Sequence, residues 1–197
     1  MFGGFRVFSL AEIRQAEPAF DRRRLSEWQG KGYIRMVIKG YYTFSDFALG
    51  DESVFEIANR IYSPSYVSFE SALSYYELIP ESIYGITSAS TLKTAHFKTP
   101  VGEFSYRSIH PKLYFGFELL KAEDKIYKLA SMEKALLDFL YFRPSIREVF
   151  DFAGLRLNLK ILQRLIDRKK MNVYAQAFLQ KSLIKRMRVL WRYIEHA

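Results

Sequence analysis

The sequence predicts an α+β protein of two units, a small one over residues 1–45 and a larger one over residues 46–197. Two helical patterns and two β-prone runs fill the first 45 residues, and further β-prone runs follow one another from Ile83 to Ala130. Helical periodicity returns after Asn158. We therefore expect a mixed or antiparallel sheet flanked by helices, and a long amphipathic helix at the end of the chain.

The first 20 residues contain the signals of a short helix. Ser9 can cap the segment LAEIRQA, with Glu12 three residues later as its capping-box partner, and Pro18 closes this helix or opens the next. Only eight residues precede Ser9, so there is little room for an additional helix. Phe5, Val7 and Phe8 instead predict a strand or a small apolar lid.

A second helix and a hairpin follow. Asp21 can cap the segment RRRLSEWQ, and two glycines at positions 30 and 32 end it. The runs 33–38 and 41–44 are β-prone, and Lys39-Gly40 is a plausible turn between them. A short helix, a turn, a second helix and a β-hairpin in this order predict a winged helix-turn-helix.

The second helix of such a unit normally enters the DNA major groove. Helical spacing places Leu25 and Trp28 on one face and Arg23 and Ser26 roughly opposite. Arginines in the first turn of a helix place positive charge at the positive end of the helix dipole, which is unfavourable. Binding to a phosphate or a guanine would offset this cost. Pairing with Glu17 and Glu27, or simple solvation, is the structural alternative. The predicted DNA-binding residues are Arg22, Arg23, Arg24, Ser26, Arg35, Lys39 and Tyr41.

Charge is concentrated at the two ends of the chain. The net charge is +9. Residues 1–45 contain eight Lys and Arg against four Asp and Glu, and residues 156–197 contain eleven against two, so the middle is acidic. Two basic ends suit a nucleic-acid binder better than a uniformly basic chain does.

The larger unit begins with two predicted helices separated by a proline break. Asp51 or Ser53 can open the segment ESVFEIANRIY, Ser63-Pro64-Ser65 ends it, and Tyr66-Val67 is a short extended piece. Ser68 then caps the segment FESALSYYEL. For the polar residues of this segment, capping and turn roles are favoured over direct function: Asn59, Ser68, Glu70 and Ser71.

Three segments in this order resemble the AbiEi-type antitoxins of bacterial type IV toxin-antitoxin pairs. They are GYIRMVIKGYYTF at 32–44, IANRIYSPSYVSFESALSYYELIPES at 57–82, and SMEKALLDFLYF at 131–142, which contains an acidic-lysine pair and an aspartate expected to be buried. The resemblance implies a repressor of its own gene pair, with operator DNA as partner. It also implies that the C-terminal unit counters a nucleotidyltransferase-like toxin, without necessarily forming a stable complex.

The segment from Ile83 to Ala130 predicts five strands with frequent aromatic residues and no intervening helices, which excludes a Rossmann-type fold. The nearest candidates for an enzymatic metal site are Glu123-Asp124-Lys125, expected in a turn, and Glu133-Lys134, expected to face water or cap a strand end. No spacing predicts a metal site, a catalytic triad or a phosphate loop, so we expect neither an enzyme nor a cofactor.

The C-terminal segment predicts two helices, NLKILQRLIDRKK and a longer one from about Asn172 to His196. Leu179, Leu183, Met187, Leu190 and Ile194 form an apolar stripe along the longer one. Another side of the same helix carries a second basic surface, which consists of Lys181, Lys185, Arg188 and Arg192. A solvated face, a DNA-backbone contact and a surface for an acidic partner are the alternatives for it.

The chain lacks cysteine, any apolar run of about 18 residues and the pattern of a secretion signal at its start, so we expect a cytoplasmic protein that does not bind a membrane. Two functional alternatives to the antitoxin remain open. One is a stand-alone transcription regulator whose second unit binds an effector or dimerises. The other is a DNA-acting nuclease.

Overall fold

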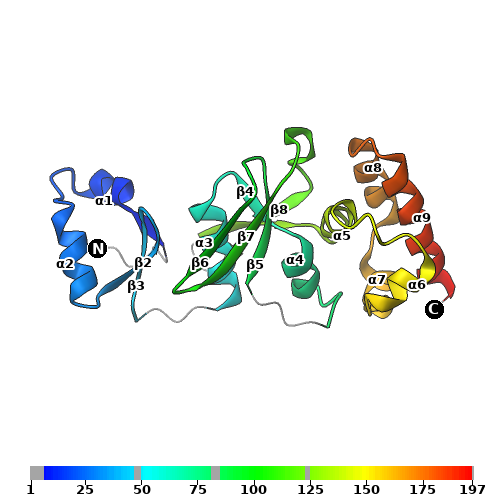
Figure 1. The fold of residues 1–197 in the computed structure, drawn as a ribbon, viewed down its shortest axis with the longest axis horizontal. Coiled ribbons are helices and arrows are strands. Elements are labelled where there is room, and N and C mark those ends of the chain that lie inside the picture. The colour runs from blue at the N-terminus through cyan, green and yellow to red at the C-terminus, as the bar shows by residue number, and fades with distance from the viewer. Residues whose placement is uncertain (1–6, 47–49, 81–84, 123–124, 197) are drawn as a thin grey trace.

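We analysed a computed structural model of the chain that describes residues 7–46, 50–80, 85–122 and 125–196. Its described part is an α+β protein with nine α-helices, a three-stranded antiparallel sheet and a six-stranded mixed sheet, and it ends in a long helix. The molecule is elongated, with the small sheet at one end, the large sheet in the middle and the helices of residues 132–196 towards the other end (Figure 1).

The N-terminal unit contains the elements that the sequence predicts. Helix α1 (Leu10–Ala16) begins at Ser9, whose side chain forms the expected capping box with Glu12. Helix α2 (Arg23–Gly30) starts one residue later than predicted, and the Asp21 carboxylate accepts from the backbone N–H of Arg23 at 2.8 Å. Strands β2 (Ile34–Ile38) and β3 (Tyr41–Phe44) form the hairpin, with Gly40 in its turn at a φ of 94°.

The predicted strand before Ser9 is confirmed as β1 (Phe8–Ser9), which pairs antiparallel with β3 and gives the order β1-β3-β2. Phe5 lies outside the described residues. A small separate core joins this sheet to both helices and consists of Phe8, Ile13, Phe20, Leu25, Ile34 and Tyr42. The N-terminal unit therefore has an interior of its own.

The hairpin also contacts the larger unit. Val37 is buried in the main core, the large hydrophobic core formed by the large sheet and its helices, and Ile38 and Tyr41 pack against this core. Arg60, in the helix that follows the hairpin, pairs with Glu12 of α1. Strand β2 lies against strand β6 (Ala95–Thr99) of the large sheet. One face of the hairpin is thus an internal contact.

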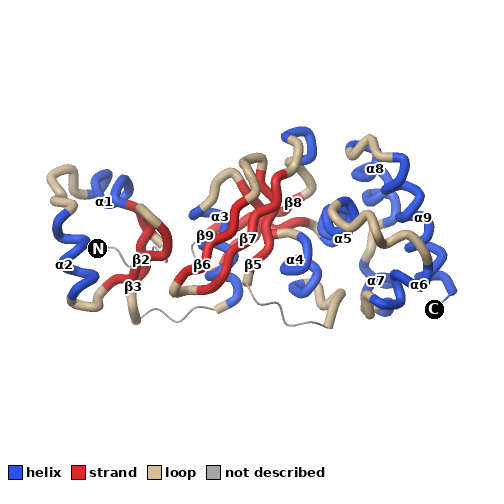
Figure 2. Tube along the Cα trace, in the orientation of Figure 1, coloured by secondary structure: helices blue, strands red, loops and turns tan. Residues whose placement is uncertain are grey.

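The large sheet has the order β6-β7-β5-β4-β9-β8 (red in Figure 2). It is mixed, because β5 runs parallel to β7 and β4 parallel to β9, whereas the other neighbours are antiparallel. The strands are β4 (Ser65–Val67), β5 (Ile86–Ser90), β6 (Ala95–Thr99), β7 (Gly102–Ser108), β8 (Phe117–Ala122) and β9 (Lys125–Ala130).

Two sequence-based details of this sheet were wrong. The sheet has six strands, because the short extended piece at Tyr66-Val67 belongs to it as strand β4. This strand lies between β5 and β9, at the centre of the sheet, which is therefore not the succession of hairpins that was expected. The segment KLYFGFELL is not one strand, because a 3-10 turn at Pro111–Leu113 and Gly116 at a φ of 72° precede β8. Helices α3 (Asp51–Ile61), α4 (Phe69–Tyr75) and α5 (Met132–Tyr141) pack against the sheet or one another.

The C-terminal helices are shorter and more numerous than predicted. They are α6 (Val149–Gly154), α7 (Leu159–Leu165), α8 (Arg168–Ala177) and α9 (Lys181–His196). The segment NLKILQRLIDRKK is split at Asp167, which caps α8 by accepting from the N–H of Lys170. The predicted helix from Asn172 is broken at Leu179, which has a φ of 52° and is 84% exposed. The other four residues of its apolar stripe are buried.

Within the described ranges, every helix is too short or too polar to cross a membrane.

Candidate nucleic-acid interface

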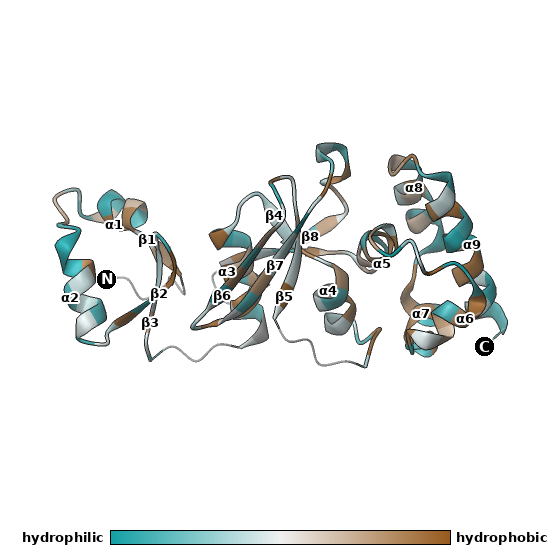
Figure 3. Cartoon of the chain, viewed as in Figure 1, coloured by the Kyte–Doolittle hydropathy of each residue, from teal (hydrophilic) through white to brown (hydrophobic). Residues whose placement is uncertain are grey.

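Three arginines are exposed at the start of α2, Arg22 at the N-cap and Arg23 and Arg24 in the first turn, and this end of the helix is hydrophilic in Figure 3. Leu25 is 2% exposed and anchors the opposite face of the helix in the small core, with Trp28 packed beside it. Arg23 and Ser26 are exposed, one helical turn apart. The division of the helix into an apolar face and a basic face, expected from spacing, is confirmed.

Arg24 differs from its two neighbours. Its guanidinium forms a 3.2 Å ion pair with Glu17 and lies 5.0 Å from the ring centroid of Phe20 and 5.2 Å from that of Trp28. Arg22 and Arg23 make no such side-chain contact within the described residues. Arg24 therefore pairs with Glu17, which was the alternative to DNA contact, whereas Arg22 and Arg23 remain available to a ligand.

The three residues predicted on the hairpin lie in different environments. Lys39 is exposed at the turn. Arg35 is half-buried and donates at 3.1 Å to the carbonyl of Ser45, just beyond the end of β3. Tyr41 is half-buried and packs against the main core. Of this set, only Lys39 projects as a free basic group. Sequence reasoning passed over Tyr33 and Met36, which are 59% and 44% exposed on the same hairpin.

The second basic surface lies on α9. Lys181, Lys185, Arg188 and Arg192 are all exposed, on the side of the helix away from the buried residues Leu183, Leu190 and Ile194. Lys185, Arg188 and Arg192 line a pocket that Lys181 does not reach. In Figure 1 this helix and α2 lie at opposite ends of the molecule, so the two basic surfaces are separate.

The segments 57–82 and 131–142 meet in a buried polar cluster between β4 and α5. Asp138, which is fully buried as expected, accepts from the hydroxyls of Tyr66 at 2.9 Å and Ser68 at 2.8 Å. Lys134 pairs with the same carboxylate and donates to the Tyr66 hydroxyl at 2.7 Å. The Ser68 side chain therefore does not cap α4, because Asp138 takes its hydrogen bond.

Burial is the largest influence on the pKa values of Lys134 and Tyr66 in this cluster. It lowers the pKa of Lys134, against the opposing effect of Asp138, and it raises the pKa of Tyr66 well above its ordinary range, with Asp138 acting in the same direction. The rings of Tyr66, Phe115 and Phe178 surround the ammonium group at 5.1 to 5.3 Å. Gly116 packs on the stem of Lys134, where an added Cβ would approach the lysine side chain to 3.1 Å. An enclosed cluster of this kind holds two elements together and offers no access to a substrate.

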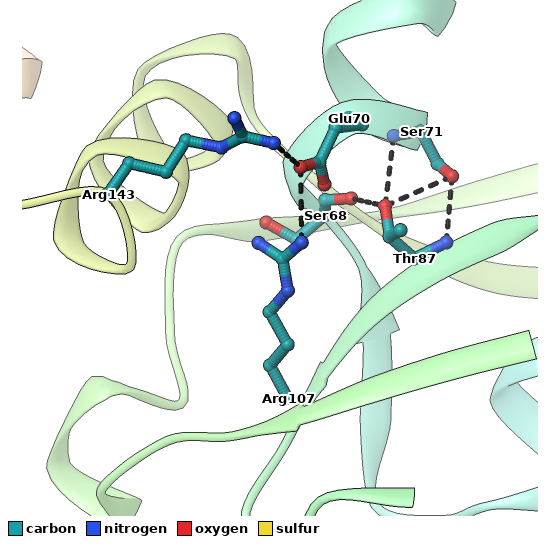
Figure 4. A network of polar contacts seen from close by, with 6 residues as sticks. All are labelled: Ser68, Glu70, Ser71, Thr87, Arg107 and Arg143. Atoms are coloured by element: carbon teal, nitrogen blue, oxygen red, sulfur yellow. Dashed lines mark hydrogen bonds and ion pairs between the residues drawn. The ribbon is translucent and has the colours of Figure 1, made fainter. Parts of the chain in front are cut away.

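Glu70 and Ser71 take part in a second polar network at the start of α4 (Figure 4). Arg107 of β7 and Arg143 both donate to one oxygen of Glu70, at 3.1 and 2.5 Å. Burial raises the pKa of Glu70, but the hydrogen bonds from the two arginines and its own backbone N–H outweigh burial, and the net shift is downward. Thr87 of β5 exchanges hydrogen bonds with Ser71 and donates to the carbonyl of Ser68. The capping and turn roles predicted for Ser68, Glu70 and Ser71 were therefore wrong, because these side chains bind residues of distant elements.

The expected exposure of Glu133-Lys134 was wrong. Glu133 is 4% exposed and pairs with Lys170 at 3.0 Å, and Lys134 lies in the buried cluster. Helix α5 packs on α4, α8 and α9, so both faces that flank this pair are covered. Glu123 and Asp124 lie outside the described residues. Nowhere in the described ranges do three His, Asp or Glu side chains come together as metal ligands.

No protein-family model matches this chain, and a search of curated proteins returned no significant relative.

Proposed function

We propose that this protein is a DNA-binding repressor of its own gene pair and the antitoxin of a type IV toxin-antitoxin system. The observation that carries the DNA-binding part is the free pair Arg22 and Arg23, together with Ser26, on a helix whose other face is locked into a small core. In this proposal the unit of residues 1–45 is a winged helix-turn-helix, α2 is the recognition helix, and Lys39 contacts a phosphate beside it.

The arrangement of side chains supports separate tasks for the three arginines. Arg24 is held by Glu17 and two aromatic rings, so it orients the turn that precedes α2. Arg22 and Arg23 face solvent at the N-terminus of the helix, where base edges or phosphates would approach. Arg35 and Tyr41, which take part in internal contacts, support the hairpin in this proposal.

The antitoxin part of the proposal rests on the sequence resemblance. The residues at the centre of the resembling segments, Tyr66, Ser68 and Asp138, join β4, α4 and α5 in one buried cluster. Because these residues are buried, they stabilise the fold and cannot contact a toxin. In this proposal, the surface that acts against the toxin lies elsewhere on the chain.

The test compares Arg22→Ala/Arg23→Ala with Arg164→Ala/Lys169→Ala, which removes the same charge from exposed positions of α7 and α8. We expect the first variant to bind DNA from upstream of its own gene at least about tenfold more weakly in a mobility-shift titration, because each base contact contributes about 1–3 kcal/mol. The control should bind like the unaltered protein. Equal binding by all three proteins would refute the assignment of α2.

The antitoxin part needs its own experiment. The unaltered chain and Arg22→Ala/Arg23→Ala are each co-expressed with the product of the adjacent gene, which we expect to be a nucleotidyltransferase-like toxin. The variant should still restore growth while failing to repress the promoter. Absence of such a toxin, or growth arrest in the presence of either protein, would favour the alternative of a stand-alone regulator.

A further inference from the structure

The pocket on α9 lies between that helix and the segment that leads from α5 into α6. Its volume is about 870 Å³, which is in the range of small-molecule sites. Nine residues line it: Pro144, Arg147, Glu148, Ser182, Lys185, Arg186, Arg188, Val189 and Arg192. Five of these carry a positive charge and one carries a negative charge, so the pocket is strongly cationic.

The lining contains one carboxylate against five positive charges, so most of its positive charge is not neutralised. Over the described ranges, Arg147, Lys185, Arg188 and Arg192 have no Asp or Glu within ion-pair distance. The one carboxylate of the lining belongs to Glu148, and the nearby Asp151 carboxylate accepts from the backbone N–H groups of Arg147 and Glu148. Arg147 Nε donates to the carbonyl of Pro144 at 2.9 Å. The four cationic side chains around this cavity repel one another unless an anion binds between them.

Arg186 contributes a positive charge to the pocket lining, and hydrogen bonds hold its guanidinium in place. Its side chain is 5% exposed, and it donates to the backbone carbonyls of Leu140, Arg143 and Ser182. Arg147 lines the same pocket, and burial, followed by the charge of Arg147, lowers the pKa of Arg186. Three carbonyls fix the position of this guanidinium at the end of α5, beside the pocket.

The cations approach the cavity from two sides. Lys185, Arg188 and Arg192 follow one edge of α9 at spacings of three and four residues, and Arg147 comes from the segment before α6. The three cations of α9 lie along a line, as in a groove that follows a DNA backbone, but Arg147 adds a cation from a second element of the same cavity. Pro144 and Val189 add an apolar part to the lining.

We propose that this pocket binds a nucleoside di- or triphosphate through its phosphate chain. Several phosphate charges match the several uncompensated cations, and guanidinium groups can form paired hydrogen bonds with phosphate oxygens. The apolar residues and the planar faces of the arginines provide a surface for a base. This site is distinct from the DNA interface proposed for α2 and does not depend on it.

The test is calorimetric titration of the full chain with ATP, GTP, AMP and inorganic tripolyphosphate. Arg188→Ala/Arg192→Ala is the pocket variant, and Arg164→Ala/Lys169→Ala is the charge-matched control from α7 and α8. Both altered arginines of the pocket variant are exposed, so folding should be preserved, which circular dichroism can check. Arg186 is left intact because it holds the end of α5.

We expect a triphosphate to bind the unaltered protein and the control equally, and to bind the pocket variant at least tenfold more weakly. AMP should bind more weakly than ATP or GTP. Tripolyphosphate that binds as tightly as the nucleotides would show that the anion is polyphosphate and that no base is read, which would overturn the nucleoside part. No binding, or equal loss in the control, would overturn the whole proposal. Weakened operator binding by the pocket variant, without any nucleotide binding, would instead assign these cations to DNA.

Discussion

Lys134 donates a 2.7 Å hydrogen bond to the hydroxyl of Tyr66, which lies 68 residues earlier in the chain, and both side chains are fully buried. The same ammonium pairs with Asp138 one helical turn along α5. The three groups therefore connect the central strand of the large sheet to the helix that covers it. Removing one partner leaves a charge without compensation in a dry environment.

The first prediction concerns this ion pair. Lys134→Met should lower the free energy of unfolding by about 3–5 kcal/mol, because the Asp138 carboxylate stays buried without its cation. Lys134→Met combined with Asp138→Asn should cost less than the sum of the two single changes, since the amide oxygen still accepts from Ser68. Urea unfolding of the four proteins measures the coupling. Additive losses would mean that the two charges do not stabilise each other.

The second prediction concerns pH. The pKa of Glu70 is lowered from its ordinary value of 4.5, so its ionised form stabilises the folded protein above that pH, and this stabilisation is lost as pH falls through the lower folded value. Glu70→Gln should be less stable near neutral pH by about 1–3 kcal/mol, and its stability should fall less steeply below pH 4.5. Unfolding by urea across this range is the measurement. Glu77→Gln, at an exposed position in the same region, is the control and should keep the steep acid dependence.

The third prediction separates Arg24 from its neighbours. In Arg22→Ala/Arg23→Ala, the dependence of the logarithm of DNA affinity on the logarithm of salt concentration should become shallower by up to about 1.8, or about 0.9 for each lost phosphate contact. Arg24→Ala should change this slope less but should lower the melting temperature, because two cation-π contacts and an ion pair are lost. An identical slope change in both variants would contradict the distinction.

The fourth prediction tests the break between α8 and α9. Leu179 is 84% exposed and has a φ of 52°, a left-handed conformation that favours glycine. Leu179→Gly should therefore raise the free energy of unfolding by about 0.5–1 kcal/mol. Gln176→Gly, at an exposed position inside α8, should lower it by a similar amount. Destabilisation by Leu179→Gly would instead support the continuous helix that hydrophobic spacing predicts.

The sequence predicted the N-terminal elements well because their signals are local. Ser9 with Glu12 and the glycine of the hairpin turn act within a few residues of their own position, and each takes the place that its spacing implies. Asp21 lies one residue before the N-cap, which is Arg22, but still accepts from the backbone N–H of Arg23. The exposed basic turn of α2 follows for the same reason, since Leu25 fixes which face is buried. For Arg35 and Tyr41 the sequence shows only residue type, and their internal contacts come from Ser45 and from the main core.

The sequence alone determined the α+β class, the order of the first helices and strands, and the concentration of positive charge at both ends, because composition and short-range patterns carry this information. Tertiary structure decided that β4 lies at the centre of a mixed sheet, that Lys134 is buried, and that Arg147 joins the cations of α9 around one pocket. Each of these depends on contacts between residues tens of positions apart. The free energy of such contacts comes from packing and desolvation, which local sequence patterns do not record.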